Sequence, residues 1–92
     1  MPDASHPHLS HPAVIKRLKR AHGHLAKVIT MLEHERPCVD VAQQLYAVER
    51  AIVLAKRTLI HDHIDNCLAG SAEAPADGEE TLTALKALTK VL

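Results

Sequence analysis

The stretch that decides the fold is residues 38–67, CVDVAQQLYAVERAIVLAKRTLIHDHIDNC. It contains no Gly and no Pro, and residues that favour helices outnumber its Val and Ile residues. Its apolar side chains recur at steps of three and four along one stripe, with a second apolar stripe beside the first. This pattern predicts one long helix that is covered on two sides, as the central element of a helical bundle.

The segments around this helix indicate two further helices. The first is expected from about His11 to Glu33 or His34, with Ser10 as its N-cap and Pro12 in its first turn. Pro37 then breaks the pattern, and so short a connection favours an antiparallel helical hairpin. We therefore divide the chain into a flexible His-containing arm (1–9), the helical hairpin (10–69), a linker (70–78) and a short amphipathic C-terminal helix (79–92).

Composition agrees with an all-α fold. The 92 residues are 47% hydrophobic, but they include one Tyr and no Phe or Trp, which suits interdigitated helices better than a β-sandwich. So short a chain buries a modest core alone, and oligomerisation would enlarge that core. The N-terminus has no apolar signal segment and no apolar run is long enough to span a bilayer, so we expect a cytoplasmic protein without a membrane partner.

The long helix separates residues that share a chemistry. Cys38 and His63 are twenty-five residues apart, which places them on nearly the same face but about 37 Å apart along a helix. If a second copy packs antiparallel, crossing near Ala51, then Cys38 of one chain lies beside His63 and Cys67 of the other. Any shared chemistry of these residues therefore implies a dimer, which we expect to be a four-helix bundle.

That shared chemistry is metal binding. His63 and Cys67 are four residues apart on a helix, so both can bind one ion, and Cys38 adds a second thiolate. Thiolate and imidazole ligands suit Cu(I), Zn(II) or Ni(II). The hairpin folds the N-terminal arm back towards this end, so that His6, His8 and His11 form either a metal-attracting tail or the source of one further nitrogen ligand.

Basic residues gather on the first helix and recur on the second. They form either a solvated face or a phosphate-binding surface, and pairing of chains would widen that surface. The candidate residues for binding nucleic-acid phosphates are Lys16, Arg17, Lys19, Arg20, Arg50, Lys56 and Arg57. The lack of aromatic residues for base stacking argues against single-stranded RNA. There is no Gly-rich phosphate loop and no evident acid/base pair, so we do not expect an enzyme.

Three segments together, HPAVIKRLKRAHGHL (11–25), RPCVDVAQQLYAVERAI (36–52) and LIHDHIDNCL (59–68), resemble the CsoR/RcnR family of bacterial metal-sensing transcriptional repressors. The resemblance covers about residues 10–68. It implies an all-helical dimer that assembles into a tetramer, with the metal site built across the dimer interface. It also implies binding to double-stranded operator DNA without a helix-turn-helix, and release of that DNA when the inducer binds.

The resemblance also implies a ligand set. The family's core ligands fall on Cys38, His63 and Cys67, and its N-terminal ligand position, thirty-two residues before the first Cys, falls on His6. This His-Cys-His-Cys set is similar to the nickel-responsive InrS- and NreA-like branch, so we expect Ni(II) as the sensed ion. The copper sensors use the same Cys-His-Cys core without His6, but they usually have Tyr where this chain has Pro37.

Four other functions stay open at this point. Cu(I) sensing is the main alternative to Ni(II) sensing. A formaldehyde sensor and a metal-storage protein that binds no DNA come behind it, followed by a plain helical interaction module.

Overall fold

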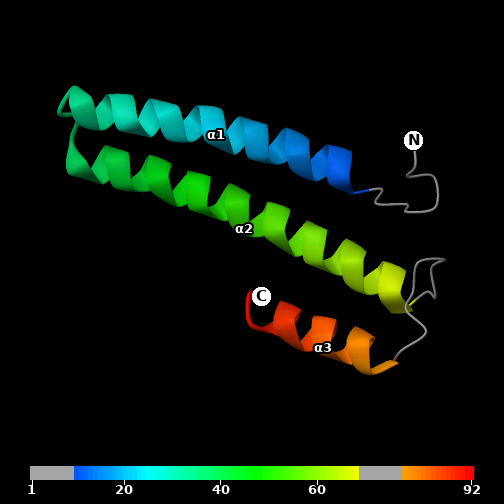
Figure 1. Ribbon diagram of the computed structural model, residues 1–92. Coiled ribbons are helices and arrows are strands. Elements are labelled where there is room, and N and C mark those ends of the chain that lie inside the picture. The colour runs from blue at the N-terminus through cyan, green and yellow to red at the C-terminus, as the bar shows by residue number, and fades with distance from the viewer. Residues whose placement is uncertain (1–9, 69–77) are drawn as a thin grey trace.

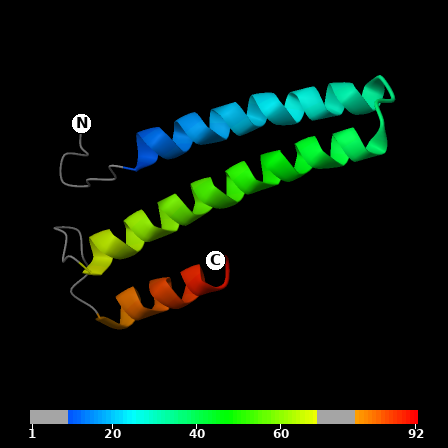
Figure 2. The same cartoon turned by 180° about the vertical axis from the view of Figure 1, so that it is seen from behind.

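The computed structural model describes residues 10–68 and 78–92. It contains α1 (His11–Glu33), α2 (Cys38–Leu68) and α3 (Gly78–Thr89). α1 and α2 run side by side in opposite directions, and α3 folds back along the C-terminal part of α2 (Figures 1 and 2). α2 lies between the other two helices and contacts both of them. The predicted all-α fold with an antiparallel hairpin is confirmed.

The helix bounds lie close to the predicted ones, with one difference at the C-terminus. α3 begins at Gly78, which the sequence assigned to the linker, and it ends at Thr89 instead of continuing to Leu92. The amide groups of Lys90 and Val91 donate to carbonyls three residues back, at 3.2 and 3.1 Å, so the helix tightens into a turn there. The predicted arm (1–9) and the rest of the linker lie outside the described residues.

α1 begins where Ser10 and Pro12 predicted, but without the side-chain contact expected of an N-cap. Ser10 occupies the N-cap position, yet its hydroxyl makes no capping hydrogen bond, so the expected side-chain cap is wrong. The Ser10 carbonyl accepts the first hydrogen bond of the helix, at 2.8 Å from the amide of Val14, as the carbonyl of an N-cap residue does. A Pro in the first turn has no N–H to satisfy, which lowers the need for a side-chain cap.

The connection between α1 and α2 is a Schellman motif built without glycine. The amide of Arg36 donates to the Met31 carbonyl at 2.9 Å, and the amide of Glu35 donates to the Leu32 carbonyl at 3.0 Å. Glu35 has a φ of 52°, in the left-handed region that Gly usually occupies at this position. These two bonds satisfy carbonyls at the end of α1 and reverse the chain within four residues, directly before α2 begins at Cys38.

The core is a narrow seam between α1 and α2. Six of its seven residues are Val or Ala and recur at intervals of seven on each helix, which is the spacing of two helices packed along their length, whereas Ile60 lies outside this series. The buried residues are Val14, Ala21, Val28, Val41, Val48, Ala55 and Ile60. Val28, Val41 and Val48 form its central cluster, with Met31 packed against them. So narrow a seam leaves most of the described leucines and isoleucines of both helices exposed on the single chain.

We predict that Glu35→Gly stabilises the hairpin. A left-handed conformation costs an L-residue about 1–2 kcal/mol, and part of this gain is offset by the greater freedom of Gly in the unfolded chain. The free energy of unfolding measured by urea denaturation should rise by about 0.5–1 kcal/mol. Glu33→Gly, in the last turn of α1, serves as the control and should lower it by about 1 kcal/mol. A loss of stability in Glu35→Gly would contradict the account of the turn.

Candidate metal centre and basic face

One side of the hairpin carries an exposed apolar face. On α1 it consists of Leu18, Leu25 and Leu32, and on α2 of Leu45, Ile52 and Leu59, each set spaced by seven residues. Leu25, Leu45 and Ile52 line one groove of about 340 Å³, so the two rows lie on the same side of the seam. Ile52 is 44% exposed and Leu45 46% exposed. Such a contiguous apolar surface is typical of a protein interface.

The two predicted metal ligands whose side chains are described lie at opposite ends of this apolar face. Cys38 is exposed and stands seven residues before Leu45, so it extends the α2 row at its N-terminal end. His63 is exposed and stands four residues after Leu59, at the other end. Because α2 is unbroken between them, the two residues are about 37 Å apart along the helix axis. Within one chain they cannot bind the same ion.

The other two predicted ligands are less defined. Cys67 belongs to the last turn of α2, so the four-residue spacing from His63 falls within a continuous helix. His6 lies outside the described residues. Among the described residues, no three His, Cys, Asp or Glu side chains are grouped so that they could hold a metal ion.

The donor chemistry nevertheless fits a soft or borderline metal ion. Cys38 supplies a thiol and His63 an imidazole, and both are open to solvent and able to meet a second chain. If the apolar faces of two chains pair antiparallel, then the Cys38 end of one helix meets the His63 end of the other. The intersubunit metal site remains a prediction, and the position of both residues at the ends of the apolar face supports it.

A cavity beside His63 brings together residues that sequence reasoning did not connect with one another. It has a volume of about 230 Å³ and is lined by His11, Leu59, Ile60, Asp62, His63 and Leu88. His11, which the sequence placed at the start of the first helix and also grouped with His6 and His8 as a possible source of a metal ligand, is the first residue of α1. Asp62 was not singled out, although one of its carboxylate oxygens is buried without a hydrogen-bond partner. The register of the hairpin, which depends on the turn at residues 34–37, brings His11 to this part of α2, and the packing of α3 against α2 adds Leu88.

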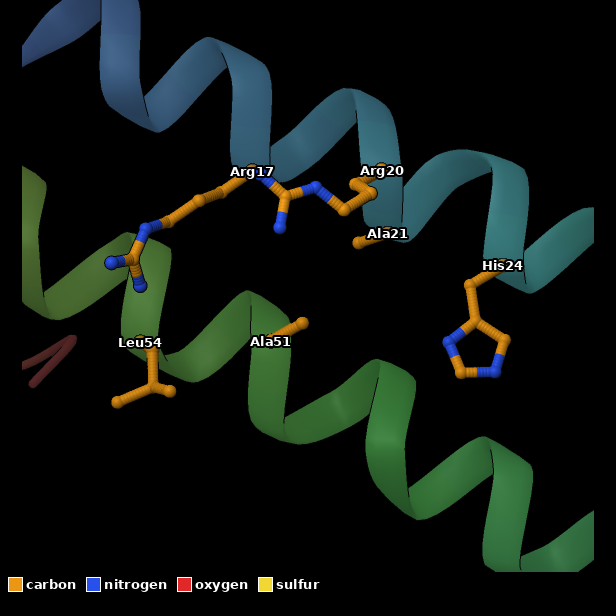
Figure 3. A pocket seen from close by; sticks show the side chains of 6 residues that line it. All are labelled: Arg17, Arg20, Ala21, His24, Ala51 and Leu54. Carbon is orange, nitrogen blue, oxygen red and sulfur yellow. The ribbon is translucent and has the colours of Figure 1, made fainter.

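The other side of the seam carries basic side chains. A groove of about 370 Å³ is lined by Arg17, Arg20, Ala21, His24, Ala51 and Leu54. Figure 3 shows both guanidinium groups on this side of the hairpin, reaching over the space between α1 and α2. A neighbouring groove of about 540 Å³ is lined by Lys19, Arg20, Gly23, His24, Lys27 and Gln44. Neither groove is lined by a carboxylate, so both suit an anion.

The structure brings together only part of the predicted DNA-binding set. Arg17, Lys19 and Arg20 line these two grooves. Lys16 is exposed on α1, outside the residues that line either groove. On α2, Arg50 and Arg57 are exposed, Lys56 is half-buried, and none of the three lines a basic groove.

Sequence reasoning missed two polar residues at these grooves. His24 and Gln44 lie on different helices, and their side chains are joined by a hydrogen bond of 2.7 Å.

Comparison with known proteins gives a consistent result. Residues 10–92 match the family described as metal-sensitive transcriptional repressor. The copper-sensing transcriptional repressor CsoR of Mycobacterium ulcerans is 42% identical over 59 residues, 64% of this chain and 50% of that protein. CsoR of Mycobacterium bovis is 35% identical over 77 residues, 80% of this chain and 65% of that protein. CsoR of Bacillus subtilis is 33% identical over 72 residues, 78% of this chain and 70% of that protein.

Two further findings concern the length of the relatives and the solved structures. The chain spans between half and about two thirds of the length of the two mycobacterial relatives. No solved structure matches it. Separately, none of the helices in the described part of the chain is both long enough and apolar enough to cross a membrane.

We predict that Ile52→Glu abolishes both dimer formation and metal binding, although every proposed ligand is still present. Ile52 lies in the middle of the apolar face, where a carboxylate would have to be desolvated on pairing. Leu54→Glu is the matched control, because Leu54 is 40% exposed but lines the basic groove. Sedimentation and anaerobic Cu(I) titration should show a monomer that binds no metal for Ile52→Glu, and a metal-binding dimer or larger assembly for Leu54→Glu. Full metal binding by monomeric Ile52→Glu would contradict an intersubunit site.

Proposed function

The chain belongs to the family of metal-sensitive transcriptional repressors, and we propose that it binds double-stranded operator DNA when metal-free and leaves the DNA when Cu(I) binds. The proposed ion site consists of Cys38 of one chain with His63 and Cys67 of a second chain. The chain would act as a dimer or as a tetramer of two such dimers. The family is one of repressors, in agreement with the expectation that the chain is not an enzyme.

The observation that carries the proposal is the division of the hairpin into two faces. The exposed ends of the apolar face carry a thiol and an imidazole, and the other side of the seam carries basic grooves without carboxylates. A ligand that changes how two chains pair through the apolar face therefore changes how their basic grooves are spaced. DNA phosphates lie at fixed intervals, so affinity depends on that spacing.

Cu(I) takes first place over Ni(II) because of the relatives. The sequence expectation put Ni(II) first, on the basis of His6 and Pro37. The similar proteins from Mycobacterium and Bacillus are named as copper sensors, which favours the alternative. Two thiolates and one imidazole make a trigonal site that suits Cu(I) without a fourth ligand.

Ni(II) remains the second candidate because of the sequence at the N-terminus. Four ligands in a plane suit Ni(II), and His6 would supply the fourth. A formaldehyde sensor or a storage protein without a DNA role has no comparable support from the relatives.

In the proposed mechanism, metal binding shifts a population between two arrangements of the chains. Cys38 and His63 approach each other across the dimer when both ligate one ion, and the arrangement in which they are close binds DNA less well. The ion must prefer this arrangement by a differential affinity, and DNA must disfavour the ion by the same factor. Coupling of about 1–3 kcal/mol is typical and corresponds to a change in DNA affinity of about 5–150-fold.

We predict that Cu(I) weakens DNA binding by at least about tenfold at fixed salt, within the usual range of allosteric coupling. The measurement is fluorescence anisotropy with a labelled duplex that the metal-free protein has enriched from a random pool. His6→Ala should leave the Cu(I) response unchanged, because the trigonal site does not use His6.

Other outcomes would point elsewhere. If Ni(II) releases the DNA, Cu(I) does not, and His6→Ala abolishes the release, then the chain is a nickel sensor. Metal binding without enrichment of any duplex would leave the storage protein as the better account.

A further inference from the structure

A side-chain hydrogen bond ties α1 to α2 on the basic side of the hairpin. The Nε2 atom of His24 and the Oε1 atom of Gln44 are 2.7 Å apart. An amide oxygen can only accept, so in this arrangement the His24 Nε2–H donates to Gln44. His24 lines both basic grooves and Gln44 lines the second, so the bond lies where the two grooves adjoin.

The bond holds the two helices together beside the arginines. Arg17, Arg20 and His24 follow one another at steps of three and four, so successive turns of α1 carry them along one groove. Figure 3 shows the His24 ring directed from α1 towards α2, on the same side as both guanidinium groups. The α2 wall of this groove consists of the apolar residues Ala51 and Leu54, which offer an anion no competing hydrogen bonds.

The two guanidinium groups suit a phosphodiester oxygen pair. Arginine binds phosphate through paired N–H groups in a fixed fork, so its contribution depends on where the fork is held. Both arginines are on α1, whereas the opposite wall of the groove belongs to α2. The width of the phosphate site therefore depends on the spacing of α1 and α2, and the buried seam residue that lines this groove is the small Ala21.

We propose that His24 and Gln44 are positioning residues for DNA binding. Their hydrogen bond holds the α1–α2 groove at the width at which both Arg17 and Arg20 can bind a DNA phosphate. This inference rests on the proposed DNA-binding function and adds two residues to it. Neither His24 nor Gln44 needs to touch DNA.

The same bond links the DNA-contacting helix to the metal-ligating helix. Gln44 stands six residues after Cys38 on α2, about 9 Å along the helix axis. No Gly or Pro interrupts α2, so a displacement of its Cys38 end is carried to Gln44. His24 is on α1, with the arginines. In the metal-loaded arrangement the His24–Gln44 hydrogen bond is therefore broken, and Arg17 and Arg20 no longer bind the phosphate together.

The test compares His24→Ala, Gln44→Ala and the double variant in the full chain. A net hydrogen bond contributes about 0.5–1.5 kcal/mol, so each single variant should weaken metal-free DNA binding about 2–10-fold. The double variant should be no weaker than the weaker single variant, since both remove one contact. The slope of log affinity against log salt should stay unchanged in Gln44→Ala, because no phosphate-binding cation is removed.

A second readout separates positioning from a general effect on folding. Metal-loaded Gln44→Ala should bind DNA as weakly as metal-loaded wild type. The ratio of metal-free to metal-loaded DNA affinity should therefore be smaller in Gln44→Ala than in wild type, by the factor that the variant loses in the metal-free state. His22→Ala and Gln43→Ala are the matched controls, since both residues are exposed and line neither basic groove. Both control variants should retain the wild-type ratio.

The variant Arg17→Gln separates this inference from the proposed function. It should weaken binding and reduce the salt slope by about one ion. If Arg17→Gln changes neither, the basic face does not bind DNA and the proposed function fails. If Arg17→Gln behaves as expected while His24→Ala and Gln44→Ala resemble their controls, the inference alone is wrong. Equal weakening of both metal states, with a lower midpoint of thermal unfolding, would reduce the pair to a structural role and also overturn it.

Discussion

The length of α2 is the constraint on which the rest of the structure depends. Its 31 residues form one continuous helix, with Cys38 as its first residue and His63 near its end. A rigid helix keeps these two proposed ligands about 37 Å apart, so a shared ion requires a second chain. An antiparallel pair satisfies this requirement twice, once at each end. The exposed row from Cys38 through Leu45, Ile52 and beyond provides the surface for such a pair.

The hairpin has a weak core and two different outer faces. The seam between α1 and α2 is formed by residues such as Val28 and Ala55, which bury little area each. Much of the stability of the folded chain is therefore expected from pairing through the apolar face. Metal ions that bind only the paired form would stabilise it further, by mass action. The basic grooves lie on the other side of the same seam, so both faces respond to the spacing of two helices.

Sequence reasoning predicted the helices because their boundaries are local. Pro12 and Pro37 mark two helix starts, and the lack of Gly and Pro from Cys38 onwards predicts one long helix. The turn itself was harder to predict, because Glu35 adopts a conformation in which Gly is usual. Ser10 occupies the N-cap position, in agreement with the general preference for Ser there, but its hydroxyl does not make the capping hydrogen bond.

Contacts between helices could not be predicted in the same way. The bond between His24 and Gln44 and the cavity that joins His11 to Asp62 both depend on the register of the hairpin. That register follows from the geometry of the turn, and the periodic pattern of apolar residues within each helix does not predict this geometry. The residues of the proposed metal site could be named from the sequence because, in a helix of known rise per residue, the number of residues between two ligands gives the distance between them.

Mixing of two inactive variants tests most directly whether the metal site is shared between chains. Cys38→Ser lacks the ligand at one end of α2, and His63→Ala lacks the ligand at the other end. In a mixed dimer one site loses both ligands and the second site keeps both, so random mixing should restore about a quarter of the wild-type Cu(I) sites. The thiolate-to-metal absorption measured after unfolding and refolding the two variants together reports that number. No recovery, or intact Cu(I) binding by either variant alone, would contradict an intersubunit site.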